Sequence, residues 1–144
     1  MDFIDIYIKQ FLKIKKYKNE KIIIILMEKI AEGLSCSSNS QALGTFEYVK
    51  NVEDVINLFD NASGKICIVE DAGTTTLGPI LSDLVGVICT KGSAGSHLAI
   101  VSREFNLPCV MNTRFKIQDL SSLKGKKGKI TTEEEDKGIV YLVK

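Results

Sequence analysis

A chain of 144 residues is long enough to bury the core of one compact domain. Its apolar content of 44% and charged content of 26% are typical of a soluble globular protein, and a net charge of +1 argues against a nucleic-acid partner. The longest apolar run near the start, residues 22–27, is far below the roughly 20 residues that span a bilayer, and no signal-peptide pattern precedes it. We therefore expect no membrane partner.

The four cysteines stand at positions 36, 67, 89 and 109, without a CxxC pair, and the chain has one histidine. A Cys/His zinc site is hard to assemble from this set, so no metal site is expected. Cys67 and Cys89 lie inside apolar runs and are predicted to be small core residues. Free thiols of this kind fit a reducing compartment, which predicts a cytoplasmic protein.

The first 32 residues are expected to be a helical linker or docking segment. Residues 2–17 space their apolar side chains as one face of a helix, with lysines on the other side. The segment is either a helix that docks on a membrane surface or a partner, or a capping or linker helix whose lysine face is solvated. We favour the second interpretation. Residues 22–31 fit a strand or a helix, and we favour a helix because Gly33 can close it.

Residues 33–144 are expected to form a second unit. Its first elements are predicted as a strand at 45–50, a helix at 52–59 beginning near Asn51, a strand at 65–69, a helix at 77–84 and a strand at 85–89. The runs 65–69 and 85–89 are continuously apolar, which is typical of parallel strands covered on both faces. Pro79 in the first turn favours the helix between them, and the crossover is expected to be right-handed.

The strand–helix pattern then repeats. A glycine-serine loop is followed by a helix at 97–105, which Asn106 and Pro108 end, and by a strand at 109–111. A hairpin with strands at 130–133 and 139–142 closes the chain, after a lysine-rich turn. These elements predict an α/β fold with a central, mainly parallel sheet flanked by helices, and a C-terminal β-hairpin.

The chemistry is expected where the loop Gly92–Ser96 delivers the single histidine, His97, to the start of a helix. Ligands of open parallel sheets bind beyond the carboxyl ends of the strands, where this loop lies. Gly92 and Gly95 let backbone amides face a ligand, and the Ser96 hydroxyl is expected to cap the helix. A helix start attracts phosphate and disfavours imidazolium, so His97 is suited to accept a phosphoryl group as a neutral nucleophile.

Residues 91–110 resemble the signature of the phosphohistidine swivelling domain of phosphoenolpyruvate-utilising enzymes, such as pyruvate phosphate dikinase, phosphoenolpyruvate synthase and enzyme I of the sugar phosphotransferase system. That signature is approximately Gly-Gly-x-Thr-Ser-His-x-Ala-Ile-x-Ala-Arg-Glu, with a proline about four residues later. Its most specific part here is Ser96-His97-x-Ala99-Ile100-x-x-Arg103-Glu104 with Pro108. The resemblance extends over about residues 33–144 and implies a β/β/α swivelling domain.

The resemblance implies that His97 is the phosphorylated residue, and that Gly92, Ser96 and Arg103 match the first glycine, the hydroxyl residue and the helix arginine of the signature. Arg103 lies nearly two turns from His97, so we expect it to fix the helix or loop. Ser93 and Gly95 depart from the family's second glycine and threonine. The expected substrate-binding set is Gly92, Ser93, Gly95, Ser96 and Arg103.

The function implied is a phosphoryl or pyrophosphoryl carrier that moves the group between a nucleotide or phosphoenolpyruvate site and an acceptor site. Such a phosphotransferase component, of the kinase or dikinase type, needs nucleotide-grasping or phosphoenolpyruvate/pyruvate-binding partner domains. No cofactor is expected on this domain, and Mg²⁺ is expected with the partners. The alternative is a non-catalytic interaction or regulatory module, which Ser93 and Gly95 would favour.

Overall fold

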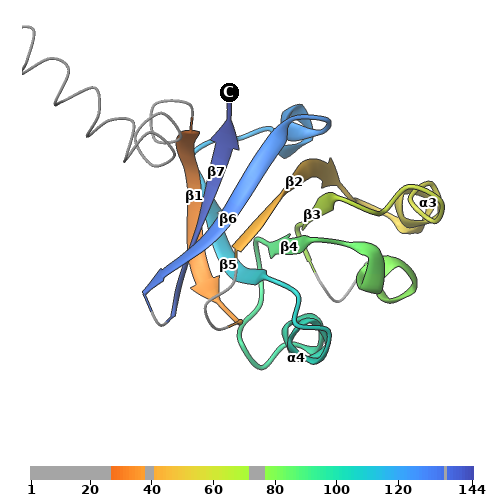
Figure 1. Ribbon diagram of the computed structural model, residues 1–144, viewed down its shortest axis with the longest axis horizontal. Coiled ribbons are helices and arrows are strands. Elements are labelled where there is room, and N and C mark those ends of the chain that lie inside the picture. Colours follow the sequence, from red (N-terminus) through yellow and green to blue (C-terminus); the bar gives the residue numbers. More distant parts are fainter. Residues whose placement is uncertain (1–26, 38–40, 72–76, 135) are drawn as a thin grey trace, which may run out of the picture.

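The computed structural model describes residues 27–37, 41–71, 77–134 and 136–144. Seven strands close into a barrel in the order β1-β5-β4-β3-β2-β6-β7 (Figure 1). The elements are β1 Met27–Ser35, β2 Gln41–Tyr48, α3 Val52–Ile56, β3 Lys65–Val69, the 3₁₀ helix η1 Gly78–Asp83, β4 Gly86–Cys89, α4 His97–Glu104, β5 Cys109–Phe115, the 3₁₀ helix η2 Leu120–Leu123, β6 Lys127–Glu134 and β7 Lys137–Val143.

The predicted α/β fold, a central mainly parallel sheet flanked by helices, is wrong. Only β2–β3, β3–β4 and β4–β5 pair in parallel, whereas β1–β5, β1–β7, β2–β6 and β6–β7 are antiparallel. The ring closes because β1 bridges β5 and β7, and because the hairpin β6–β7 joins β2. A sheet that closes in this way covers one of its faces with its own strands instead of a second layer of helices.

The helix favoured for residues 22–31 is also wrong where the structure describes it, since Met27–Ser35 is one strand that crosses the expected boundary at residue 33. Two register shifts interrupt its pairing, one between Lys29 and Ala31 and one between Glu32 and Leu34. The first shift leaves Ile30 and Ala31 buried side by side. Bulges of this kind erase the period of two by which a strand is recognised in a sequence. Residues 1–26, including the helical pattern at 2–17, lie outside the described residues.

The helices α3, η1 and α4 lie on one side of the barrel in Figure 1, away from β1, β6 and β7. Asn51 caps α3 as predicted, in a capping box with Asp54. The helix predicted at 77–84 is present as the 3₁₀ helix η1, with Pro79 in its first turn. The segment closes with bonds three residues apart, such as the one from Ile80 N–H to the Leu77 carbonyl, and Pro79 is tolerated in its first turn, where an N–H would lack a partner.

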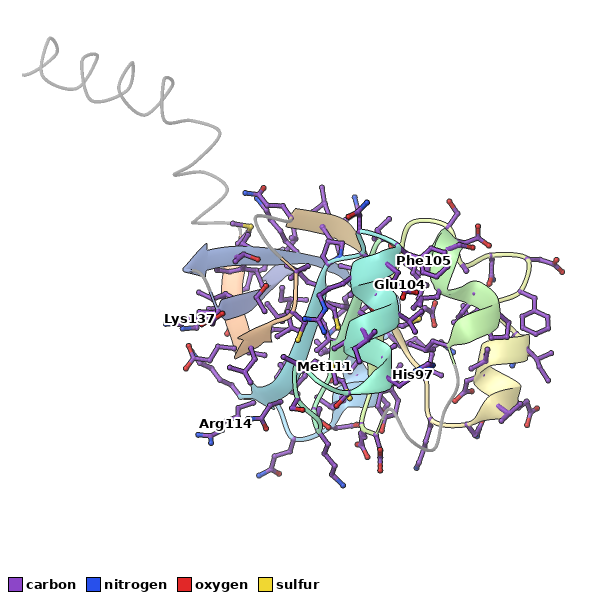
Figure 2. All side chains as sticks on the ribbon, turned by 90° about the horizontal axis from the view of Figure 1, so that it is seen from below. His97, Glu104, Phe105, Met111, Arg114 and Lys137 are labelled. Atoms are coloured by element: carbon purple, nitrogen blue, oxygen red, sulfur yellow. The ribbon has the colours of Figure 1, made fainter. Side chains whose placement is uncertain are left out.

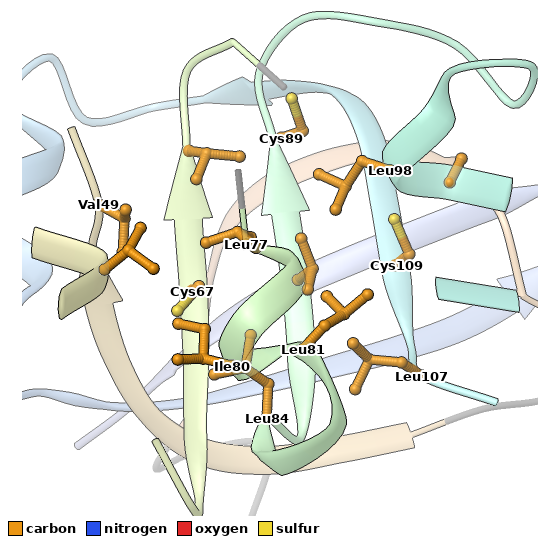
Figure 3. Packing of buried hydrophobic residues seen from close by; sticks show 14 of the residues in the cluster. Val49, Cys67, Leu77, Ile80, Leu81, Leu84, Cys89, Leu98, Leu107 and Cys109 are labelled. Atoms are coloured by element: carbon orange, nitrogen blue, oxygen red, sulfur yellow. The ribbon is translucent and has the colours of Figure 1, made fainter. Parts of the chain in front are cut away.

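Alternate residues of the parallel strands enter two separate cores. Cys67, Val69 and Val87 face outward to an outer core beneath the helices. Figure 3 shows Cys67 in this core, with Leu77, Ile80 and Leu81 of the η1 segment and Leu98 of α4. Ile66 and Ile68 face inward to an inner core inside the barrel. The inner core also receives residues of the other strands: Ile30, Ala31, Phe46, Ile88, Val110, Ile130 and Val140. The predicted burial of both faces of these strands is therefore confirmed. Helices cover one face, and the other face lies inside the barrel.

The remaining predicted elements are present. The strand at 65–69 is β3, the strand at 85–89 is β4, and β4 runs parallel to both β3 and β5. Asn106 takes the predicted left-handed conformation after α4, with φ of 52°. The hairpin is β6–β7, and β5 continues to Phe115, beyond the predicted strand.

Candidate functional site

The glycine-serine loop, Gly92–Ser96, leaves the carboxyl end of β4 and enters α4 at His97. Figure 2 shows α4 along the outside of the barrel, with His97 at one end and Glu104 and Phe105 at the other. The His97 side chain is exposed. Since α4 starts where the loop ends, the ring stands at the positive end of the helix dipole.

Gly92 is required by the backbone of this loop. Its φ of 106° is a conformation that residues with a side chain rarely adopt. A Cβ at this position would lie 2.7 Å from the terminal methyl of Met111 and 2.9 Å from Ser96 Oγ. Gly95 is different, because a Cβ there would meet only Ser93 Oγ, at 3.8 Å. Only the first of the two glycines is therefore fixed by packing.

The two serines fold the loop onto itself. The Ser93 N–H donates to Ser96 Oγ at 2.8 Å, the Ser96 N–H donates to the Ser93 carbonyl at 3.0 Å, and Ser93 Oγ accepts from the Gly95 N–H at 3.3 Å. The φ of Ser93 is not positive, so the loop accommodates a serine there without backbone strain. The prediction that the Ser96 hydroxyl caps α4 is wrong, because that oxygen accepts from Ser93 and makes no cap bond.

The absence of a cap bond from Ser96 affects how the start of α4 can bind an anion. The first N–H groups of an α-helix have no partner within the helix. Ile100 N–H bonds the Ser96 carbonyl, which starts the helical ladder. The preceding amides of His97, Leu98 and Ala99 are the first-turn donors, and Ser96 Oγ does not occupy them. They can donate to an anion beside the imidazole.

Arg103 ties the loop to the far part of α4. Its guanidinium donates to the Ala94 carbonyl at 2.6 Å, across nearly two helical turns. The bond reaches the middle of the loop, so Arg103 orients the backbone that leads to His97. A charge-assisted bond of this kind contributes about 1.5–3 kcal/mol when buried and less at an exposed site such as this one.

Sequence reasoning missed a set of residues around the same strand ends. Tyr48 Oη donates to Glu70 Oε1 at 2.8 Å, and Thr90 Oγ1 donates to the Glu70 carbonyl at 2.9 Å. Partial burial and then the Glu70 hydrogen bond raise the pKa of Tyr48 to about 12. These residues join the carboxyl ends of β2, β3 and β4. Their only sequence signal is a polar residue directly after an apolar strand.

Met111 was missed as well, although it sits against Gly92 and is fully buried. Nothing in the sequence distinguishes it from any other apolar strand residue. The structure thus brings the whole predicted set together: Gly92, Ser93, Gly95 and Ser96 form the loop, His97 follows it, and Arg103 reaches back to it. In the described ranges, no group of three or more His, Cys, Asp or Glu side chains is arranged to hold a metal ion.

Comparison with known proteins identifies the family. Residues 61–135 match the family model described as "PEP-utilising enzyme, mobile domain", which is more than half of the chain and includes the glycine-serine loop and α4. A mobile domain is thus the class to which this barrel and its loop correspond. The chain belongs to the family of mobile domains of phosphoenolpyruvate-utilising enzymes.

No curated protein matches the chain. Among solved structures, it is similar to muramoyltetrapeptide carboxypeptidase from Oxalobacter formigenes, at 13% identity and a TM-score of 0.47. The similarity covers 83% of this chain and 51% of that one, so the chain spans about half the length of that protein. None of the helices in the described ranges has the length and apolar character needed to cross a membrane.

Proposed function

We propose that this chain is a phosphoryl carrier in which His97 is transiently phosphorylated. The observation that carries the proposal is the family match across a loop that presents one exposed histidine at a helix start. Gly92 and the two serines hold the loop, and Arg103 fixes its middle. The first-turn amides of α4 and its dipole favour a phosphoryl group on the ring.

In the proposed step, a ring nitrogen of neutral His97 attacks the phosphorus of the donor. An N–P bond forms, the P–O bond to the leaving group breaks, and the leaving oxygen keeps the electron pair. The other ring nitrogen retains its proton. Transfer to the acceptor reverses these bond changes, with an acceptor oxygen or water as the attacking atom. The first-turn amides stabilise negative charge in both directions.

The donor and acceptor are proposed to be bound by partner domains, in the same chain or in another. A nucleotide-grasping domain or a phosphoenolpyruvate/pyruvate-binding domain would load and unload His97, as in a kinase or dikinase. Mg²⁺ is proposed to enter with the donor phosphates on the partner, where it neutralises their charge. The reaction is proposed to take place in the cytoplasm.

The test is transfer of labelled phosphate. The chain is mixed with candidate partner domains, Mg²⁺ and either labelled phosphoenolpyruvate or labelled ATP. We expect acid-labile, alkali-stable label on the wild type and none on His97→Ala. Because the chain has one histidine, the assignment is direct. Partner binding that is unchanged in His97→Ala, with no label on the wild type, would instead support a non-catalytic module.

A second measurement does not depend on the partner. Phosphoramidate, a small phosphoryl donor, is incubated with the chain alone, and the reaction is followed by intact mass and ³¹P spectroscopy. We expect a single phosphohistidine whose formation is lost in His97→Gln. A matched control is Asn106→Gly, at the opposite end of α4, which keeps the left-handed conformation and should react as the wild type does.

A further inference from the structure

Two cysteines face each other where β1 ends and β5 begins. The antiparallel register pairs Ser35 with Val110, and the next step along both strands places Cys36 opposite Cys109. The Cys36 N–H donates to the Cys109 carbonyl at 2.9 Å. Opposed residues of an antiparallel pair share a face and have Cα atoms about 4.5–5.5 Å apart, inside the range of about 4.4–6.8 Å that a disulfide needs.

The two sulfurs also interact. Both side chains belong to the outer core beneath α4, and each thiol shifts the pKa of the other. The neighbouring Cys109 thiol, together with the nearby Arg103 guanidinium, outweighs burial and lowers the pKa of Cys36 to about 7. The same contact and burial raise the pKa of Cys109. Cys36 is therefore the thiol of the pair that loses its proton more readily.

We propose that Cys36 and Cys109 form a reversible disulfide between β1 and β5, a redox switch beneath the helix that begins at His97. The pair has the two roles that a dithiol switch needs, an ionised sulfur that reacts first and a neighbouring thiol that resolves the product. Not every buried thiol of the chain has this environment. Cys67, for example, has its pKa raised to about 12 by burial.

The oxidant is a small peroxide, ROOH. The Cys36 thiolate attacks the terminal oxygen, the O–O bond breaks, and Cys36 becomes a sulfenic acid while RO⁻ takes a proton to give ROH. The Cys109 sulfur then attacks the Cys36 sulfur, the S–O bond breaks, and hydroxide leaves with the Cys109 proton as water. The sum is two thiols and ROOH giving one disulfide, ROH and water. Cys36 is 5% exposed and Cys109 only 1%, so a small oxidant is required, and Cys36 is the sulfur that it meets.

Arg103 connects this pair to the glycine-serine loop. Its guanidinium is close enough to Cys36 to lower the pKa of that thiol, and it also donates to the Ala94 carbonyl. A disulfide removes the negative charge that Cys36 can carry, which leaves the Ala94 carbonyl as the partner of the guanidinium. We expect the bond to Ala94 to open less often, so that the loop becomes less mobile. An effect on phosphorylation rests on the proposed function, whereas the disulfide itself does not.

The experiment is to treat the purified full-length chain with hydrogen peroxide, alkylate the remaining thiols and map the peptides by mass spectrometry. We expect the loss of two hydrogens, a peptide pair joined through Cys36 and Cys109, and full reversal by dithiothreitol. Oxidation should raise the unfolding temperature by several degrees, because a long loop is closed. Amide exchange in residues 92–96 should slow several-fold.

Several outcomes would overturn the proposal: Cys36 that stays alkylatable, a sulfinic acid at Cys36, or a disulfide to another cysteine. Loop exchange that is the same in both redox states would overturn the connection to Arg103. Cys36→Ser and Cys109→Ser should each abolish the cross-link. Cys67→Ser is the matched control, which should leave the cross-link intact, and the wild-type mapping stands if any of these variants fails to fold. All of these readouts are independent of whether His97 is ever phosphorylated.

Discussion

The two halves of the barrel differ in the direction of their strands, in the helices that cover their outer face and in the residues gathered at their ends. In the helical half, β2 to β5 run parallel and carry α3, η1 and α4 on their outer face (Figure 1). In the hairpin half, β1, β6 and β7 pair antiparallel. Parallel strands send their connections to one end, which gathers Tyr48, Glu70, Thr90 and the glycine-serine loop. The difference teaches that the helical half presents the candidate site, while the hairpin half closes the barrel.

The largest effect should come from the hairpin half. Gly128 on β6 lies directly under the ring of Phe46, and a Cβ there would overlap that ring. Because Phe46 is fully buried in the inner core, it has no space to move into. Gly128→Ala should lower the free energy of unfolding by about 2–3 kcal/mol. Urea denaturation measures this loss. A change below about 0.5 kcal/mol would show that the ring can shift and that the closure is not tightly packed.

A smaller effect is expected in the helical half, from Gly92→Ala. The positive φ and the close Met111 methyl predict a loss of about 1–2 kcal/mol. Gly95→Ala is the matched control and should change stability by less than about 0.5 kcal/mol, because its Cβ would meet only Ser93 Oγ, at an ordinary contact distance of 3.8 Å. Phosphorylation of His97 by phosphoramidate should slow in Gly92→Ala only. Equal slowing in both variants would mean that the loop responds to any added methyl group.

The halves should also differ in their response to alkali. The outer core contains thiols, whereas the inner core is hydrocarbon. Burial raises the pKa of Cys67 from 9.0 to about 12. The unfolded chain therefore loses this proton first, and stability falls as pH rises from about 9 towards 12, by at most about 1.4 kcal/mol per pH unit.

Urea denaturation at several pH values tests this, by comparing the slope for the wild type with the slope for Cys67→Ala. The slope should be shallower in the variant, whatever its absolute stability. Identical slopes would show that Cys67 is not the titrating group. Below pH 9, Cys67 should contribute no pH dependence, because its thiol is protonated in both the folded and the unfolded chain.

The smallest effect is expected from Arg103→Lys. Lysine keeps the charge but loses the planar fork that reaches Ala94. The free energy of unfolding should fall by less than about 1 kcal/mol, since the side chain is exposed. Amide exchange in residues 92–96 should nevertheless become several-fold faster. Arg114→Lys, on β5, changes the other arginine of the chain and should leave this exchange unaffected.

The helical half was predictable because its signals are local. Both faces of β3 and β4 are buried, and this burial appears in the sequence as the unbroken apolar runs 65–69 and 85–89. The same runs do not say whether helices or a barrel interior cover the second face. Closure depends on β1, whose bulges place Ile30 and Ala31 on the same side and hide its strand period. The closed barrel was not predicted because the segment that contains β1 was expected to be a helix.

The candidate site divides in the same way. Its main residues are contiguous from Gly92 to His97, so the loop was evident from the sequence. The contacts of Glu70 with Tyr48 and Thr90 depend on how three strands align, which no single segment records. The Ser96 cap was predicted incorrectly because Ser93, three residues earlier, competes for the same oxygen. The residues of the loop could be predicted from the sequence, whereas the competition of backbone groups for one hydroxyl oxygen could not.

Closure of the barrel also limits how another protein can hold this domain. Each of the seven strands has a neighbour on both sides, so no strand in the described part of the chain is a sheet edge along its whole length. A partner therefore finds no edge strand that it could extend with a full ladder of main-chain hydrogen bonds. It has to recognise side chains on the helices and loops, through contacts that form and separate as a patch. Such binding would suit the proposed carrier, which has to be released after each transfer.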